Sequence, residues 1–192
     1  MPTSLNEIAR RYQTDKADVV DWKPHAHDYC RKHYERLLEP WRNDAFTMLE
    51  IGICAPRRFP EGVGASLAMW CAYFQRGTIL GIDNRQEVVS KLVSSTRMRA
   101  YLCDQSDASQ LQQLGREQGP FRLIIDDGSH QGMHQYTSLV ALWPFLEPGG
   151  MYVVEDLLAY PEYNWRCFAH LLSSMSAAVA YNLPEPDVIL PA

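Results

Sequence analysis

Two acidic clusters, each directly after a run of apolar residues, are the groups in this chain best placed to do chemistry. Residues 126–130 read DDGSH after the run FRLII, while Glu155 and Asp156 follow the run MYVV. Short β-branched runs are typical of buried strands, and parallel strands converge at the sheet edge where open α/β folds bind ligands. Crowded carboxylates repel one another unless a cation or bound protons relieve them. Because oxygen ligands suit a hard divalent ion, the pattern predicts Mg²⁺ with His130 beside it.

The elements that must position these groups alternate regularly along the chain. Apolar runs that read as strands are separated by segments with helical spacing. This alternation predicts an α/β fold with a parallel sheet and right-handed crossovers. The predicted strands are residues 46–51, 78–82, 99–103, 121–125 and 151–154, and the predicted helices are residues 65–74, 86–94, 108–117 and 133–145.

Both ends of the chain differ from this alternating centre. A capping box at Ser4 and Glu7 predicts a first helix, and a second is predicted over residues 27–41, with a polar loop at 13–16 between them. The tail offers a helix at 164–179 and one short strand at 188–190. We expect one domain, with a helical preface (1–42), an α/β core (46–157) and a tail (158–192). The tail could leave the sheet edge shortened and exposed, covered by a second copy in a homo-oligomer, or paired differently.

Every predicted strand carries acid at its carboxyl end. Glu50 ends the first, with Gly52 just beyond it, and Asp83 and Asp104 follow the second and third. The remaining two strands end in the acidic clusters described above. One such acid could cap a helix, but five at the same sheet edge are hard to explain by capping alone.

The acid after the second strand indicates a nucleoside cofactor, because such an acid commonly accepts hydrogen bonds from ribose hydroxyls. Folds that bind dinucleotides carry G-x-G-x-x-G after the first strand, whereas the turn after the first strand here contains only one of those glycines, Gly52. Glu50, in the same turn, would repel a pyrophosphate but would suit the positive charges of S-adenosylmethionine. Residues expected at the cofactor site are Glu50, Gly52, Ser66, Asp83, Asp104, Gln105 and Asp126.

Composition limits the classes of partner. The 192 residues carry a net charge of −5 and contain no basic run with interleaved aromatics, which argues against nucleic acid. No apolar stretch approaches a membrane span, and the N-terminus does not read as a signal peptide. The five cysteines never form C-x-x-C and are expected to be free thiols. We therefore expect a cytoplasmic protein.

The motifs DDGSH (126–130) and VED (154–156) resemble those of class I S-adenosylmethionine-dependent methyltransferases. More narrowly, the chain is similar to the metal-dependent sugar O-methyltransferases of macrolide biosynthesis, of the mycinamicin and tylosin type. The resemblance implies a Rossmann-like fold, with a mostly parallel sheet flanked by helices. Its matching stretches are residues 12–16, 33–36, 49–53, 64–67, 81–83, 125–130 and 149–157.

Site roles follow from that resemblance residue by residue. It implies Asp127, Glu155 and Asp156 as Mg²⁺ ligands, His130 as general base, and a glycosylated or polyol small molecule as acceptor. A sugar hydroxyl is a poor nucleophile, and a divalent ion that orients two acceptor oxygens favours the alkoxide while a neutral imidazole takes the proton. In-line transfer of the methyl group is then chiefly a matter of positioning.

Departures from the family keep other functions open. The second glycine of the first turn is replaced by Cys54, and the auxiliary N-terminal domain of larger members is not expected here. A metal-dependent hydrolase could use His130 to activate water, although it would leave Asp83 and Asp104 without a role. A cofactor-binding subunit without catalysis is the third reading. The i, i+4 spacing of His130 and His134 suggests zinc, but the glutamate of H-E-x-x-H is missing.

Overall fold

A seven-stranded sheet forms the centre of the molecule in the computed structural model, which describes residues 3–23, 26–55, 58–156, 180–181 and 188–191. The strand order is β3-β2-β1-β4-β5-β7-β6. The first five strands are parallel, whereas β7 pairs antiparallel with both β5 and β6. The strands are β1 (Thr47–Ile51), β2 (Thr78–Asp83), β3 (Met98–Leu102), β4 (Phe121–Asp126), β5 (Leu146–Val154), β6 (Ala180–Tyr181) and β7 (Val188–Pro191).

The five parallel strands and the helices between them confirm the predicted α/β alternation. The predicted short strand at 188–190 is confirmed as β7, which pairs antiparallel with β5, so the alternative of a shortened, exposed sheet edge is wrong. A two-residue strand such as β6 is too short to produce a periodic pattern. Strand β5 also begins five residues before the predicted 151–154. Its first half contains Pro148 and two glycines, which are unfavourable in strands and so gave no strand signal in the sequence. The predicted helix at 164–179 lies outside the described residues.

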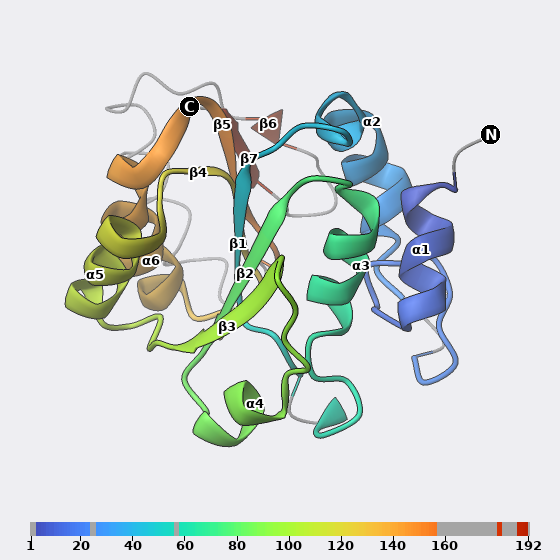
Figure 1. The fold of residues 1–192 in the computed structure, drawn as a ribbon, viewed down its shortest axis with the longest axis horizontal. Coiled ribbons are helices and arrows are strands. Elements are labelled where there is room, and N and C mark those ends of the chain that lie inside the picture. The colour runs from blue at the N-terminus through green and yellow to red at the C-terminus, as the bar shows by residue number, and fades with distance from the viewer. Residues whose placement is uncertain (1–2, 24–25, 56–57, 157–179, 182–187, 192) are drawn as a thin grey trace.

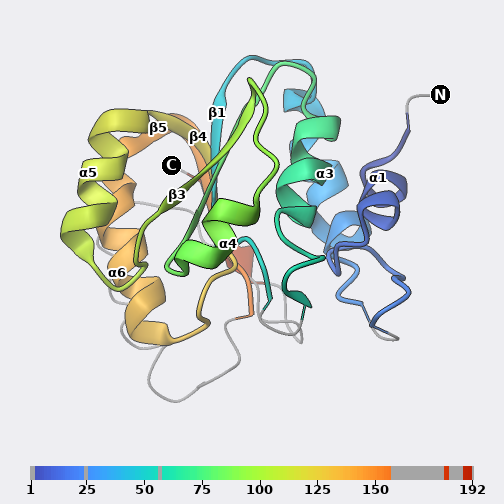
Figure 2. The same cartoon turned by 60° about the horizontal axis from the view of Figure 1, so that its bottom comes forward.

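Helices cover both faces of the sheet (Figure 1). On one face lie α5 (Ala108–Gln118) and α6 (Gly132–Leu142), and on the other lie α1 (Leu5–Tyr12), α2 (Glu35–Leu38) and α3 (Ala65–Tyr73). Figure 2 shows the same two layers with α4 (Gln86–Lys91) between them. This arrangement is the three-layer result of a βα alternation.

Alternate residues of the central strands supply two separate cores. In β1, Met48 packs on the α1 and α3 side while Leu49 packs on the α5 and α6 side, and in β4 Leu123 and Ile124 divide in the same way. All four side chains are fully buried. Side chains of a strand alternate between its faces, so a continuous apolar run is what a sheet covered on both faces requires.

The helical preface packs into the core on the α3 side. Ser4 caps α1 as predicted, with Glu7 N donating to Ser4 Oγ at 3.2 Å and Ser4 N donating to Glu7 Oε2 at 2.9 Å. The second predicted helix starts at Cys30 and consists of a π-helical turn (Cys30–Tyr34), α2 and a 3₁₀ turn (Glu39–Trp41). Leu5 and Tyr34 are buried, and the Tyr34 ring meets Trp70 of α3 edge-on. The preface therefore shares one core with the sheet.

The described part of the chain contains no helix with the length and apolarity needed to cross a membrane. Its four cysteines, Cys30, Cys54, Cys71 and Cys103, are free thiols.

Candidate active site

A pocket of about 740 Å³ opens at the carboxyl ends of the parallel strands, where the sequence places its acids. Loops after β1, β2, β3 and β4 contribute to its walls, as does the loop between α1 and the second preface helix. Ligands in open α/β sheets bind at this edge. The fold thus brings the predicted cofactor side and the predicted metal side into one cavity.

Gly52 makes the close approach of β1 and β4 possible. Its φ is +83°, and its amide donates to the carbonyl of Ile82 at 2.9 Å. A Cβ at this position would overlap the carbonyl oxygen of Asp127 and would lie 2.8 Å from the Cα of Gly128. Only glycine fits both this backbone conformation and this contact.

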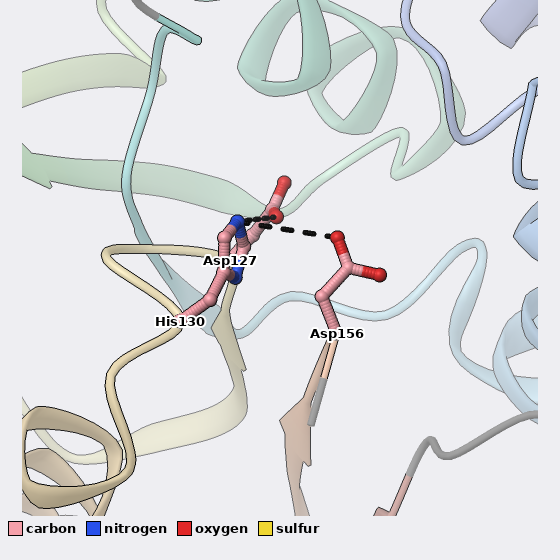
Figure 3. Close-up of side chains that lie close together, drawn as sticks. All are labelled: Asp127, His130 and Asp156. Atoms are coloured by element: carbon pink, nitrogen blue, oxygen red, sulfur yellow. Dashed lines mark ion pairs between the residues drawn. The ribbon is translucent and has the colours of Figure 1, made fainter. Parts of the chain in front are cut away.

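Three side chains converge at the pocket floor, each offering one ligand atom within 4.8 Å of the others (Figure 3). His130 Nε2 lies 4.0 Å from Asp127 Oδ1 and 3.9 Å from Asp156 Oδ2. His130 and Asp156 have φ values of +57° and +52°, and such strained residues are concentrated at functional sites. We call Asp127, His130 and Asp156 the outer cluster.

The predicted metal ligand Glu155 lies behind the outer cluster. Its side chain is buried and accepts from Lys16 Nζ at 2.5 Å and from the hydroxyl of Tyr34. Lys16 Nζ also donates to Asp127 Oδ2 at 2.6 Å and lies 3.5 Å from Glu50 Oε1. Lys16 belongs to the predicted polar loop at 13–16, and the sequence pattern did not indicate a role for it.

Other preface residues hold Asp156 from the opposite side. The Tyr29 hydroxyl donates to Asp156 Oδ1 at 2.6 Å, and His27 Nδ1 lies 3.7 Å from the same oxygen. His27 in turn contacts Lys23, which pairs with Asp15 at 2.7 Å. The preface therefore forms one wall of the pocket and supplies partners for the acids at the ends of β4 and β5.

Electrostatics at the floor reflect burial and mutual charge. Burial opposes the charged form of Lys16, but Asp127, Glu155 and Glu50 together raise the pKa of its ammonium well above the usual value. Burial raises the pKa of Glu50 to about 7, against the attraction of Lys16. Burial likewise raises the pKa of Glu155 well above its usual value, against the attraction of Lys16.

The predicted cofactor residues divide into two groups. Gly52, Ser66, Asp83, Asp104 and Gln105 line the pocket, whereas Glu50 and Asp126 do not. Glu50 is fully buried and accepts from Ser66 Oγ at 2.8 Å. The side chain of Asp104 closes a turn with Ser106, whose amide donates to it at 2.8 Å.

Asp83, the acid predicted to bind the ribose, already pairs with Arg85. Arg85 donates to its two oxygens through Nε at 3.0 Å and Nη2 at 3.1 Å. The same Nη2 donates to the carbonyl of Cys54, which itself lines the pocket. Arg85 thus ties the unusual turn after β1 to the end of β2, a contact that the sequence pattern did not reveal.

Asp126 supports the loop that carries the outer cluster. It is fully buried and accepts from Gln105 Nε2 at 2.6 and 2.7 Å and from Ser138 Oγ at 2.6 Å. Gln105 Oε1 in turn accepts from the amide of Ser129 at 3.0 Å. Burial raises the pKa of Asp126 to about 6, although these hydrogen bonds oppose the change.

The donor set of the outer cluster fits a hard divalent ion. Two carboxylates from the ends of two adjacent strands face one space. Carboxylate oxygens with open positions for water or substrate are what Mg²⁺ prefers. The zinc alternative gains no support within the described residues, because His134 Nδ1 lies 2.9 Å from Ser129 Oγ and is not part of the cluster.

Comparisons with known proteins agree with this geometry. A family model described as "Methyltransferase domain" matches residues 62–157. The mycinamicin VI 2''-O-methyltransferase of Micromonospora griseorubida is 40% identical over 154 residues, which cover 80% of this chain and 36% of that protein. The demethylmacrocin O-methyltransferase of Streptomyces fradiae is 39% identical over 153 residues, with the same coverage.

Solved structures extend the similarity to nearly the whole chain. The MycE methyltransferase from the mycinamycin biosynthetic pathway, in complex with Mg, SAH and mycinamycin VI, matches with a TM-score of 0.80 and 31% identity. That match covers 98% of this chain and 54% of the other. The chain therefore spans about a third of the length of these curated relatives and about half of the solved one.

Proposed function

The chain belongs to the methyltransferase domain family, and from this premise we propose that it is a metal-dependent O-methyltransferase. Its methyl donor is S-adenosylmethionine, and its acceptor is a sugar or polyol hydroxyl of a secondary metabolite. The observation that carries the proposal is the joining of the Gly52–Asp83 edge and the outer cluster in one pocket. Relatives whose names specify methylation of glycosylated macrolides support the acceptor class.

The residues of the chain divide the work as follows. Asp127, Glu155 and Asp156 would hold Mg²⁺, and Glu50, Gly52, Ser66, Asp83, Asp104, Gln105 and Asp126 would form and support the cofactor side. When bound, the ion would hold the acceptor oxygens and favour loss of the acceptor proton, while S-adenosylmethionine supplies the methyl group. These assignments rest on matching motifs and on the placement described above.

His130 is the proposed general base. Its Nε2 faces both carboxylates of the outer cluster, so an acceptor hydroxyl held there would come within hydrogen-bond reach of the imidazole. Asp127 and His130 belong to one short segment after β4, which fixes the base relative to the metal ligand. The pocket walls orient the acceptor and exclude water, which is where most of the rate gain in a methyl transfer arises.

Two other functions are less well supported. A hydrolase would use the same cluster but would leave the Asp83 edge idle. A subunit without catalysis would not need the convergence of His130 with two acids. We also propose that the chain forms one domain and acts in the cytoplasm, because the preface shares the core of the sheet and the described cysteines are free thiols.

Single-turnover transfer of a labelled methyl group to glycosylated macrolide acceptors tests the proposal. We expect transfer by the wild type in the presence of Mg²⁺ and none after chelation. His130→Ala should retain binding of S-adenosylhomocysteine but lose about 10²–10⁴-fold in rate. His134→Ala is the matched control, because that imidazole pairs with Ser129 outside the cluster. Equal rates in the wild type and His130→Ala would show that His130 is not the base.

A further inference from the structure

Lys16 is a buried cation set between three acids that come from three different strands. Its Nζ lies 2.6 Å from Asp127 Oδ2, 2.5 Å from Glu155 Oε2 and 3.5 Å from Glu50 Oε1. Glu50 lies in β1, and the other two acids follow β4 and β5. Lys16 is only 1% exposed.

The backbone holds Lys16 firmly in this position. Its carbonyl accepts from the amide of Cys30 at 2.9 Å, and the carbonyls of Asp15 and Ala17 accept from His27 at 2.8 Å and Asp28 at 2.9 Å. These three hydrogen bonds connect the loop to residues 27–30, where the second preface helix begins. A side chain on such a loop has little freedom to leave the acids.

The ammonium divides the acids of the floor into an inner and an outer half. Asp127 is the shared residue, because its Oδ2 binds Lys16 whereas its Oδ1 faces His130. Glu155 and Glu50 complete the inner half around Lys16, and Asp156 lies in the outer half. The inner half already holds a cation, and the outer half is open to the pocket.

We propose that Lys16 is a positioning residue that acts as a fixed counter-ion. It competes with the divalent ion for the oxygens of Asp127 and Glu155 and weakens the affinity of the floor for that ion. The inference rests on the proposed function, since it concerns the metal of that site. Two positive charges a few ångströms apart repel strongly in a low-dielectric site, so removing the ammonium should tighten divalent-ion binding. A merely structural lysine would have the opposite effect, because its loss would loosen the ligands.

Titration with Mn²⁺, followed by electron paramagnetic resonance, measures this effect without turnover. We expect one Mn²⁺ per wild-type chain and binding at least about tenfold tighter in Lys16→Met. Lys16→Arg, which keeps the charge, should stay close to the wild type. Lys91→Met is the matched control, because it removes an exposed cation at the end of α4, outside the pocket. It should change the Mn²⁺ affinity much less.

Thermal unfolding gives a second measurement of Mn²⁺ binding, which can be made even if the variant is less stable than the wild type. Ligands stabilise the state that binds them, so Mn²⁺ should raise the melting temperature of Lys16→Met more than that of the wild type. If the single variant does not fold, Lys16→Met with Glu50→Gln removes the cation together with one buried acid, and tighter Mn²⁺ binding is expected there as well.

The outcomes separate the two proposals. Wild type that binds Mn²⁺, together with a folded Lys16→Met that binds it equally or more weakly, would overturn the role of Lys16 and leave the proposed function intact. A wild type without a Mn²⁺ site would refute the metal-dependent function and this inference together.

Discussion

Gly52→Ala is the substitution that the site geometry constrains most tightly. Gly52 has a φ of +83°, and a Cβ there would meet the main chain of Asp127 and Gly128, including the carbonyl carbon of Asp127 at 2.9 Å. Backbone atoms cannot rotate away as a flexible side chain can. Relief requires a shift of the segment that carries the outer cluster.

The expected cost has two parts. The left-handed backbone conformation costs a residue with a Cβ about 1–2 kcal/mol. Overlap with a closely packed neighbour typically adds about 1–3 kcal/mol. We therefore expect Gly52→Ala to lower the free energy of unfolding by roughly 2–5 kcal/mol and to weaken binding of S-adenosylhomocysteine, because the turn it distorts lines the pocket.

Gly149→Ala is the matched control for this substitution. Gly149 has a φ of +78°, nearly that of Gly52, but a Cβ there would have no atom within 4 Å. Both variants restrict the unfolded chain equally, so that contribution cancels in the comparison. Gly149→Ala should cost only the conformational part, about 1–2 kcal/mol, and should leave ligand binding unchanged.

Urea unfolding and calorimetry with S-adenosylhomocysteine measure the two effects. We expect a larger loss of stability for Gly52→Ala than for Gly149→Ala, and weakened ligand binding in Gly52→Ala alone. Equal losses of stability, together with equal affinities for the ligand, would refute the claim that the Gly52 contact joins the cofactor turn to the outer cluster.

Three further predictions follow from named contacts. Folding raises the pKa of Asp126 from 3.8 to about 6, so its protonated form favours the native state. Lowering the pH from 7 to 5 should therefore stabilise the wild type relative to Asp126→Asn by about 1 kcal/mol, and a difference in urea midpoints that is independent of pH would contradict this. Asp83→Ala should weaken S-adenosylhomocysteine binding by about 1–3 kcal/mol in calorimetry, and unchanged affinity would remove Asp83 from the site. Tyr29→Phe removes the hydrogen bond to Asp156 and should lower Mn²⁺ affinity about 10–100-fold, whereas an unaltered titration would show that Tyr29 does not orient this acid.

The sequence predicted the fold because its signals are local. Continuous apolar runs identified the five parallel strands, and Ser4 with Glu7 identified the start of α1. The acid at each strand end could be placed at one sheet edge from topology alone, since parallel strands end on the same side. Asp127, Glu155 and Asp156 were therefore predicted to lie together beside His130. The structure groups Asp127, Asp156 and His130, whereas Glu155 pairs with Lys16 behind them.

Features that depend on distant contacts could not be predicted. Lys16 lies 111 residues before Asp127, and nothing in its loop indicates a buried position. Two acids predicted at the cofactor site do not line the pocket, namely Glu50 and Asp126, although they lie at the carboxyl ends of β1 and β4. Whether such an end residue faces the pocket or the layer behind it depends on its packed neighbours. For Asp126 these are Gln105 and Ser138.

A crystal of the chain grown with S-adenosylhomocysteine and Mn²⁺ would test the central claim most directly. Anomalous scattering locates the ion without any need to know the acceptor. We expect a single Mn²⁺ bound by Asp127, Glu155 and Asp156, with the ligand in the same pocket and its ribose at Asp83. An ion bound elsewhere, or a ligand outside the Gly52–Asp83 edge, would contradict it.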